Sequence, residues 1–393
     1  MTNKVDLNLL FVVHDASRTG APIVLLHFLR WLKKNTDITF TTLIMQHGEM
    51  DDDFAALGSV VFWDKQKYYH TSFGMRLLSR INKLFKDEPL YINFPKKLSA
   101  CHFDLIYLNT VAANSLALTL KSVYNCPVLC HIHENEFTID NHYPNYLNDE
   151  IKNSIDHYIA VSESTKNNLV NNHKIPQQSI DICYEFVPTA DFCIATKSAQ
   201  KVREELFLTT EFIVGGSGLT TWRKGIDLFL QLAFRIDLLD VENNIKFIWV
   251  GKESDEFINQ REYELKRLGL QDKIIFTGVS KSPSDFFQLF NVFALTSRED
   301  PFPLVCLEAA SMGIPVFCFE QAGGMTEFVA LGAGKVFPYG NIDAMAGEII
   351  KFAKSAGTKK LHMPEALSLV QKFDVNTQSP GILKVINEVI TNA

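Results

Sequence analysis

Residues 8–34 read NLLFVVHDASRTGAPIVLLHFLRWLKK and contain the first unit of the fold. The run from Asn8 to Val13 is short and mostly apolar, which is typical of a parallel strand covered by helices on both faces. A loop through Gly20 follows, and residues 22–34 repeat apolar side chains at helical spacing. Strand, glycine-containing loop and helix in this order predict the start of a doubly wound α/β sheet.

Similar units recur along the chain in two series. Further strands are predicted at residues 38–45, 105–109, 128–133 and 158–161, and the pattern lapses over residues 183–200. The second series has predicted strands at residues 212–216, 247–251, 274–278, 292–296 and 315–319, with helices at residues 226–238 and 304–312. Because 393 residues exceed the roughly 250–300 that one core supports, we predict two Rossmann-like domains facing each other across a cleft.

The domain boundaries follow from these two series. We expect an amino-terminal domain over residues 1–190, a carboxyl-terminal domain over residues 200–375, and a helix over residues 376–393 that returns toward the amino-terminal domain. Ligands of doubly wound sheets bind beyond the carboxyl ends of the strands. Residues that directly follow the predicted strands are therefore the first candidates for a functional site.

The composition is that of a folded protein and argues against several classes. The chain is 47% hydrophobic, and its net charge of −7 argues against a general nucleic-acid binder, which needs a basic surface. Seven cysteines at irregular spacing indicate reduced thiols rather than a disulfide framework. The amino terminus has no signal-peptide pattern, and no apolar run approaches the ~20 residues that span a bilayer, so we expect a cytoplasmic protein.

The strongest chemical signal is the segment 297–309, SREDPFPLVCLEA, between a predicted strand and a predicted helix. Backbone N–H groups of the loop and the positive end of the helix favour an anion such as a diphosphate. Asp300 can accept hydrogen bonds from sugar hydroxyls. Glu308 lies inside the predicted helix, where a lone carboxylate is costly unless it is paired, and a ribose diol would give it two donors. An acidic surface loop followed by a core helix is the alternative.

A second signal is the segment 215–227, GGSGLTTWRKGID, where a strand leads into a glycine cluster and a basic pair. Glycines allow the backbone to approach a ligand closely, and Lys224 can place a charge on a phosphate. A divalent metal is not required if Lys224, Arg223 and the helix start near Leu304 neutralise the phosphates. The alternative is a glycine turn with solvated charges.

Two histidines end the predicted strand VLCHIH at residues 128–133. Strand alternation places His131 and His133 on one face, and His133 can bond a sugar hydroxyl or a developing charge. A histidine satisfied by the backbone is the alternative. Cys126 and Cys130 near these histidines lack the paired spacing of a structural zinc site, so no metal is expected.

In their order along the chain, these segments resemble those of retaining glycosyltransferases of family 4, which have the GT-B fold, and the resemblance covers nearly the whole chain. Asp300 and Glu308 match the family's Glu-x7-Glu signature, with Asp in place of the first Glu. Lys224 and its following glycine match the pair that holds the donor diphosphate, whereas Gly218 stands nearest to the usual Arg. Residues 321–327 resemble the Gly-Gly-x-x-Glu loop that closes over the donor.

The resemblance also implies which residues act. It gives catalytic roles to His133, Lys224 and Asp300. It gives donor contacts to Gly20, Gly218, Arg223, Lys224, Val279, Asp300, Phe302, Pro303, Leu304 and Glu308. It implies a front-face displacement without a covalent nucleophile, in which the leaving phosphate takes the proton of the acceptor.

The activity implied is transfer of a hexose-type sugar, with retention of configuration, from a nucleotide diphosphate sugar to a glycan or lipid-linked acceptor. Surface polysaccharide biosynthesis is the setting that the resemblance suggests, with no cofactor and no nucleic-acid partner. One alternative is an epimerase or phosphorylase of the same fold. Another is a non-catalytic relative that binds nucleotide or glycan, which the departures at Asp300 and Gly218 motivate.

The stretch 71–86 has a basic amphipathic pattern. Its apolar residues follow helical spacing, and Arg76, Arg80 and Lys83 lie elsewhere on the helical wheel. Such a helix can lie in an anionic membrane surface, so peripheral membrane contact is one expectation. An ordinary packed surface helix is the alternative.

Overall fold

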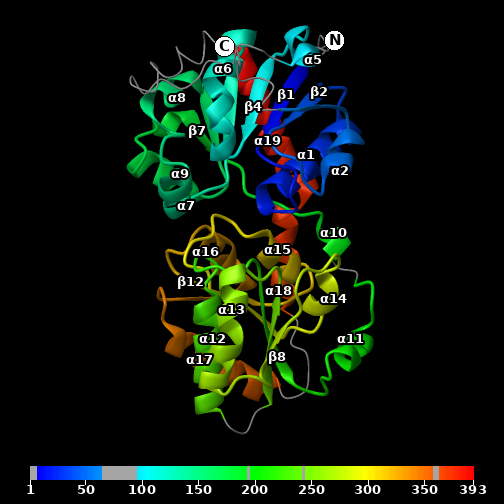
Figure 1. The fold of residues 1–393 in the computed structure, drawn as a ribbon, viewed down its shortest axis with the longest axis vertical. Helices are drawn as coiled ribbons and strands as arrows, with labels where there is room; N and C mark the ends of the chain where they lie inside the picture. The colour runs from blue at the N-terminus through cyan, green and yellow to red at the C-terminus, as the bar shows by residue number, and fades with distance from the viewer. Residues whose placement is uncertain (1–6, 64–94, 193–194, 241–243, 357–362) are drawn as a thin grey trace. The chain divides into compact units, whose positions relative to one another are not determined.

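The computed structural model describes residues 7–63, 95–192, 195–240, 244–356 and 363–393, and the chain divides into two compact units (Figure 1). The amino-terminal unit consists of Met1–Ala160, Lys166–Cys183 and Ser379–Ala393. The carboxyl-terminal unit consists of Val161–Thr165 and Tyr184–Gln378. The amphipathic stretch 71–86 lies outside the described residues, so its membrane contact stays a prediction.

In the described part of the amino-terminal unit, seven parallel strands form one sheet in the order β3-β2-β1-β4-β5-β6-β7. The strands are β1 Asn8–Val13, β2 Thr39–Ile44, β3 Ser59–Phe62, β4 Leu105–Asn109, β5 Val128–Ile132, β6 His157–Ala160 and β7 Ile180–Ile182. The helical segments are α1 Gly20–Asn35, α2 Asp51–Ala55, α5 Lys96–Ser99, η1 Val111–Leu116, α6 Ala117–Tyr124, α7 Glu136–His142, α8 Asp149–Ser154, α9 Glu163–Asn171, η2 Gln177–Ser179 and α19 Val375–Asn392. The first residues of α9 and α19 belong to the carboxyl-terminal unit.

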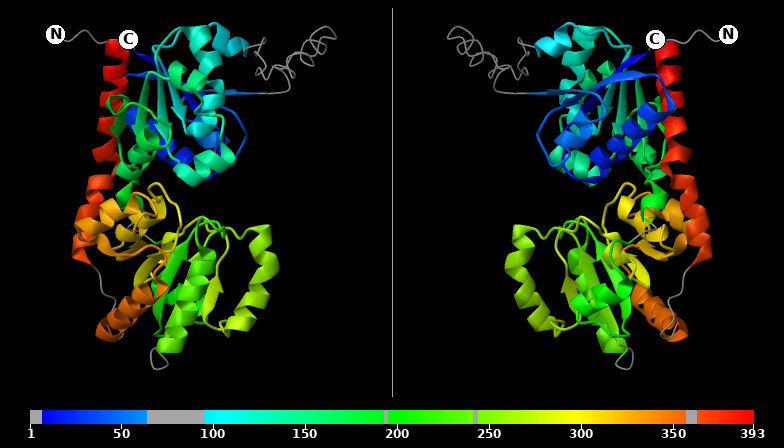
Figure 2. Two further views of the ribbon diagram at one scale, coloured as in Figure 1. Left: turned by 90° about the vertical axis from the view of Figure 1, so that its left-hand side faces the viewer. Right: turned by 90° about the vertical axis from the view of Figure 1, so that its right-hand side faces the viewer.

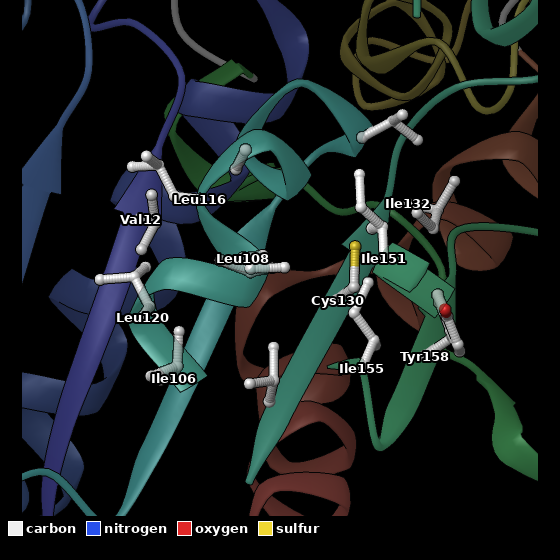
Figure 3. Packing of buried hydrophobic residues seen from close by; sticks show 14 of the residues in the cluster. Val12, Ile106, Leu108, Leu116, Leu120, Cys130, Ile132, Ile151, Ile155 and Tyr158 are labelled. Carbon is white, nitrogen blue, oxygen red and sulfur yellow. The ribbon is translucent and has the colours of Figure 1, made fainter. Parts of the chain in front are cut away.

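Apolar side chains fill the space between this sheet and its helices (Figure 3). Those on one face include Leu108, Cys130, Tyr158, Leu120 of α6 and Ile151 of α8. On the other face, the rings of Phe11 and Tyr107 pack with Phe28 of α1. Helices on both faces explain why the strands are nearly continuous apolar runs.

In the described part of the carboxyl-terminal unit, six parallel strands form a sheet in the order β10-β9-β8-β11-β12-β13. The strands are β8 Phe212–Ser217, β9 Ile245–Val250, β10 Ile274–Phe276, β11 Val292–Leu295, β12 Val316–Phe319 and β13 Gly334–Phe337. The helical segments are α10 Thr189–Phe192, α11 Ala199–Glu205, α12 Ile226–Leu239, α13 Asp255–Leu268, α14 Ser284–Phe287, α15 Leu304–Ala310, α16 Met325–Phe328, η3 Val329–Ala333, α17 Ile342–Ala356, α18 Pro364–Val370 and η4 Gln371–Phe373. Helices α12 and α17 lie side by side on one face of the sheet (Figure 2).

The strand order reverses once in each sheet, between β1 and β4 in the first and between β8 and β11 in the second. Crossovers that leave on opposite sides of such a point open a crevice at the carboxyl ends of the two strands, which is where ligands bind in this class of fold. The prediction of two doubly wound α/β sheets is confirmed. The loops after β1, β4, β8 and β11 are therefore the places to look for a functional site.

Several predicted strands and one predicted helix extend one or two residues past their observed ends. Strand β10 ends at Phe276 and helix α15 at Ala310, two residues earlier than predicted in each case. Gly278 and Gly313 follow with φ of +69° and +73°, a conformation that turns the chain out of a regular element. Strand β5 ends at Ile132, so His133 is the first residue after the strand.

Two features are absent from the part of the chain that the structure describes. None of its helices combines the length and apolar character needed to cross a membrane. Its His, Cys, Asp and Glu side chains do not gather in any group of three or more that could hold a metal ion.

Candidate functional site

Hydrogen bonds connect the loop that follows β8 to the loop that follows β11, at the switch point of the carboxyl-terminal sheet. The backbone N–H of Arg298 donates to the carbonyl of Arg223, and the guanidinium of Arg223 donates to the carbonyl of Glu299, both at 2.8 Å. The hydroxyl of Thr296 donates to the carbonyl of Gly225 at 2.9 Å. The two strongest sequence signals, far apart in the chain, therefore form one structure.

Two glycines make this close approach possible. Gly225 has a φ of +66°, and a Cβ there would lie 1.9 Å from the carbonyl oxygen of Thr296. Gly323 has a φ of +137°, and a Cβ there would lie 1.8 Å from the carbonyl oxygen of Asp300. The backbone N–H of Asp300 donates to the carbonyl of Ala322 at 2.6 Å. A side chain at Gly225 would displace the backbone at Thr296, and one at Gly323 would displace the backbone at Asp300.

The centre of this structure is an ion pair between Lys224 and Asp300. The Nζ atom of Lys224 lies 2.5 Å from Oδ2 of Asp300, and the side chains are only 16% and 7% exposed. Ser297 donates a hydrogen bond to the same oxygen at 3.0 Å. Burial alone would raise the pKa of Asp300, but the charges of Lys224 and Arg223 and the hydrogen bonds outweigh burial and lower it.

Two positively charged side chains lie beside Asp300. A guanidinium nitrogen of Arg223 lies 3.7 Å from Oδ1 of Asp300, so two cations share this carboxylate. Arg298 is engaged elsewhere, in a bidentate pair with Asp227 at 2.8 and 2.7 Å. Lys224 and Arg223 thus bring two cations beside Asp300, an arrangement that suits an anionic ligand such as a phosphate.

Gly218 lies beside the side chain of Lys224. It has a φ of +138°, and a Cβ there would lie 3.4 Å from Cδ of Lys224, so the lysine stem passes close to the glycine. An arginine, which the resemblance places near position 218, would be strained in this backbone conformation. Arg223 is a second cation beside Lys224 in this chain.

Glu308 lies on α15, eight positions after Asp300. Burial raises its pKa to about 7. Near neutral pH the side chain is therefore divided between its protonated and ionised forms. A ligand that donates hydrogen bonds to the carboxylate would favour the ionised form.

The other predicted donor contacts fall into two groups. Phe302, Pro303 and Leu304 are buried, and the ring of Phe302 packs against Tyr184 and Phe373 with centroids 5.3 and 5.4 Å away. The Phe302 ring is thus part of the local core. Val279, by contrast, follows β10 and is 73% exposed.

Glu327 of the glycine-rich loop has a structural partner within the carboxyl-terminal unit. Its carboxylate accepts hydrogen bonds from the backbone N–H groups of Glu163 and Ser164, both at 3.1 Å. These residues open α9, where backbone N–H groups lack helical acceptors. Glu327 therefore caps α9, a role that the sequence did not predict.

In the amino-terminal unit, His133 lies where β4 and β5 end. Its Nε2 is 3.2 Å from Oδ1 of Asn109, the last residue of β4. The rings of His131 and His133 are 4.1 Å apart, in line with the predicted common face. Gly20 opens α1 on the exposed surface, and a Cβ there would meet nothing within 4 Å. Neither packing nor backbone conformation therefore requires glycine at position 20.

A buried carboxylate lies beside His133. Glu134 accepts hydrogen bonds from the backbone N–H groups of Val111 and His133 at 3.2 and 3.0 Å. Burial raises the pKa of Glu134 even though these bonds and the neighbouring histidines oppose the shift. Thr110 has a φ of +88°, which is strained for a β-branched residue, and its hydroxyl lies 3.3 Å from Nδ1 of His14.

Two family descriptions match this chain, one in each half. The description Glycosyltransferase Family 4 matches residues 19–191, and the description Glycosyl transferases group 1 matches residues 198–366. The chain belongs to glycosyltransferase family 4. The resemblance inferred from the sequence is confirmed.

The matches to curated relatives cover only part of this chain and only part of each relative. The O-antigen biosynthesis glycosyltransferase WclY of Escherichia coli is 26% identical over 228 residues, which cover 54% of this chain and 60% of the relative. The alpha-galactosylglucosyldiacylglycerol synthase of Streptococcus pneumoniae is 28% identical over 202 residues, which cover 50% of this chain and 49% of the relative.

Solved structures match this chain over nearly its whole length. Anabaena HepE, in complex with UDP and glucose, has a TM-score of 0.79 at 18% identity, with 97% of this chain and 100% of that chain covered. Sucrose-phosphate synthase from Thermosynechococcus elongatus has a TM-score of 0.75 at 15% identity, with 98% and 100% covered. At these identities the match shows the fold, which is GT-B.

Sequence reasoning missed three polar residues of the family 4 amino-terminal unit, namely Asn109, Thr110 and Glu134. All three directly end or follow an apolar strand of the predicted sheet. That position was the available signal, because parallel strands bring their carboxyl ends to one edge.

Proposed function

We propose that this chain is a retaining glycosyltransferase that transfers a hexose-type sugar from a nucleotide diphosphate sugar to a glycan or lipid-linked acceptor. The observation that carries the proposal is the Lys224–Asp300 ion pair beside Arg223 at the switch point of the carboxyl-terminal sheet. Two cations at this position suit a diphosphate. The names of WclY and of the pneumococcal lipid synthase support a surface glycan or glycolipid as acceptor.

The donor is expected to bind the carboxyl-terminal unit. Lys224 and Arg223 would neutralise the diphosphate, and Glu308 would accept hydrogen bonds from the ribose diol. Asp300 would meet the sugar hydroxyls, and Val279 would lie near the base. UDP is the first nucleotide to test, because the HepE structures contain UDP or UDP-glucose.

The proposed reaction needs no metal and no covalent enzyme intermediate. The bond between the anomeric carbon and the diphosphate oxygen breaks as the acceptor oxygen bonds the same face of that carbon. The acceptor proton passes to the leaving diphosphate. Lys224 and Arg223 would stabilise the charge that develops on this leaving group, which is the main source of rate enhancement. His133 is the predicted contact for the transferred sugar.

The proposal is tested by incubating the full chain with UDP-, GDP-, ADP- and TDP-sugars and glycan or lipid-linked acceptors, in the presence of EDTA. Release of nucleotide diphosphate together with a sugar-labelled acceptor of unchanged anomeric configuration is the expected result. An epimerised donor would indicate an epimerase, and binding without turnover would indicate the non-catalytic alternative. Lys224→Met should abolish turnover, whereas Lys266→Met, an exposed lysine of α13, should not.

A further inference from the structure

Arg298 lies two positions before Asp300, and its side chain reaches into the loop that follows β8. Its guanidinium forms a bidentate pair with Asp227 at 2.8 and 2.7 Å, and its side chain is 16% exposed. One of the same nitrogens donates to the carbonyl of Trp222 at 2.8 Å, and the guanidinium lies over the Trp222 ring, 4.8 Å from its centroid. A planar group with donors in fixed directions can hold these partners at the same time.

These contacts enclose the basic pair, Arg223 and Lys224, from both sides along the chain. Trp222 directly precedes the basic pair, and Asp227 follows it in the first turn of α12. The N–H of Gly225 donates to the same carbonyl of Trp222 at 3.0 Å. Holding both ends of so short a segment restricts the backbone from which the two cations extend.

The backbone of Arg298 adds a further connection. Its N–H donates to the carbonyl of Arg223 at 2.8 Å, and the guanidinium of Arg223 donates to the carbonyl of Glu299 at 2.8 Å. Burial alone would raise the pKa of Asp227, but hydrogen bonds and the charge of Arg298 outweigh burial and lower it. The carboxylate therefore stays ionised beside the guanidinium at neutral pH.

We infer that Arg298 and Asp227 are positioning residues, which hold the loop after β8 so that the basic pair stays beside Asp300. The ligand of the basic pair, a nucleotide diphosphate, rests on the proposed function. Arg298 and Asp227 would act on this ligand through the basic pair rather than by touching it, because their charged groups already bind each other.

Asp227 separates positioning from a simple effect of charge. Asp227→Asn removes a negative charge near the site, and Coulomb's law alone then predicts tighter binding of an anionic ligand. If Asp227 positions the loop, the same substitution should weaken binding, because the guanidinium of Arg298 loses its charged partner. We expect the affinity for a nucleotide diphosphate to fall about fivefold.

Calorimetry on the full chain measures this sign, with whichever of UDP, GDP, ADP and TDP binds the wild type best. Arg298→Gln should lower the affinity about tenfold, and the double variant with Asp227→Asn should lie near that value rather than near the roughly fiftyfold product, since the two residues act as one unit. Asp237→Asn is the matched control, because Asp237 lies on the same helix and pairs with Lys273 at 2.8 Å. It should leave the affinity unchanged. Tighter or equal binding in Asp227→Asn would overturn the inference.

Hydrogen exchange of the free protein tests the inference without any nucleotide. Peptides over residues 219–226 should exchange faster in Arg298→Gln, and peptides over residues 296–300 should exchange faster in Asp227→Asn. Exchange in both segments should stay unchanged in Asp237→Asn. Wild-type exchange rates in both of the other variants would overturn the inference whether or not the chain is a transferase. Faster exchange, combined with a wild type that binds no nucleotide diphosphate, would support the positioning role and reject the proposed function.

Discussion

At the scale of single residues, the site depends on a few side chains whose neighbours set their charge. Lys224 and Asp300 pair in a nearly buried setting, where each would be costly alone. No cation among the described residues forms an ion pair with Glu308, and burial raises the pKa of this side chain to about 7. Two carboxylates eight positions apart therefore sit in opposite electrostatic environments, which suits them to different parts of one ligand.

Replacing Lys224 by Met should affect both stability and binding. Removal of one partner leaves the buried carboxylate of Asp300 with reduced compensation, so the free energy of unfolding should fall by about 3 kcal/mol. The double variant Lys224→Met with Asp300→Asn should recover much of that loss in urea denaturation but should still fail to bind a nucleotide sugar. Full recovery of binding in the double variant would contradict the proposed role of Lys224.

The affinity for UDP-glucose should depend on pH through Glu308. Its folded-state pKa of about 7 lies above the ordinary value of 4.5, so the carboxyl is mostly protonated at pH 6 and mostly ionised at pH 8. Affinity measured by calorimetry should therefore fall roughly tenfold from pH 8 to pH 6. The stability of the protein without ligand should change with pH in the opposite direction. Because folding raises the pKa of Glu308, the free energy of unfolding decreases as pH rises through 7.

Glu308→Gln should flatten this pH dependence, whereas Glu264→Gln, an exposed carboxylate on α13, should leave it unchanged. UDP-glucose is preferred to UDP because its diphosphate does not titrate in this range. A pH dependence that persists in Glu308→Gln would assign the effect to another group.

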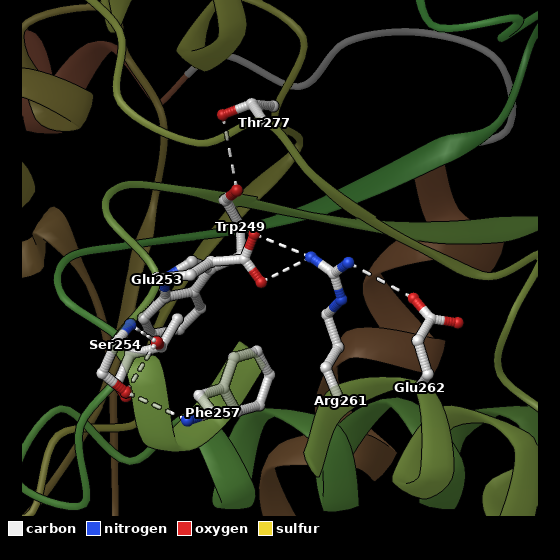
Figure 4. Close-up of polar contacts among 8 residues, drawn as sticks. Trp249, Glu253, Ser254, Phe257, Arg261, Glu262 and Thr277 are labelled. Atoms are coloured by element: carbon white, nitrogen blue, oxygen red, sulfur yellow. Dashed lines mark hydrogen bonds and ion pairs between the residues drawn. The ribbon is translucent and has the colours of Figure 1, made fainter. Parts of the chain in front are cut away.

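At the scale of elements, helix α13 is attached to the site by its amino-terminal cap. The hydroxyl oxygen of Ser254 accepts from the N–H of Phe257 and donates to the carbonyl of Thr220, in the loop after β8. Arg261 holds Glu253, just before the cap, through two charged hydrogen bonds (Figure 4). The same cap residue thus stabilises α13 and positions the glycine-rich loop.

Ser254→Ala should therefore have two effects. Loss of the cap should lower the free energy of unfolding by about 1 kcal/mol, and loss of the bond to Thr220 should weaken the binding of a nucleotide sugar. Ser198 caps α11 in the same way, since its side chain accepts from the N–H of Lys201. Ser198→Ala should show the stability loss in urea denaturation with unchanged affinity in calorimetry. Equal affinity loss in both variants would argue against the positioning role of Ser254.

At the scale of the whole molecule, each unit carries its own sheet and its own switch point. Donor binding should then act first on the carboxyl-terminal unit. At a ligand concentration of 100 Kd, binding stabilises the folded state by about 2.7 kcal/mol, so the melting temperature should rise with UDP-sugar concentration. Hydrogen exchange should slow most in the loops after β8 and β11 and in α15.

The contrast between nucleotides makes this prediction specific. The nucleotide sugar with the correct base should slow hydrogen exchange in those loops. Lys224→Met should remove this protection, while exchange in the loops after β1 and β4 stays the same. Protection confined to the loops after β1 and β4 would place the donor in the amino-terminal unit instead.

Features that depend on neighbouring residues in the sequence could be predicted, and features that depend on distant residues could not. Apolar strand runs and helical spacing are local, so β1, β2, β4 to β6 and β8 to β12 were predicted within a few residues, whereas β3, β7 and β13 were not predicted. Lys224 and Glu308 were singled out because a motif marked them, and their chemical roles stay predictions. Asn109 and the cap role of Glu327 were missed, because an isolated polar residue in sequence does not disclose its bonded partner.

The amino-acid order alone was enough for the doubly wound sheets, the GT-B class and family 4, since these depend on periodicity and on motif order along the chain. Only the tertiary structure decided that Lys224 neutralises Asp300 and that the side chain of Asn109 bonds His133. Each of these depends on a backbone approach between residues distant in the chain, and such an approach is settled by packing rather than by local preference.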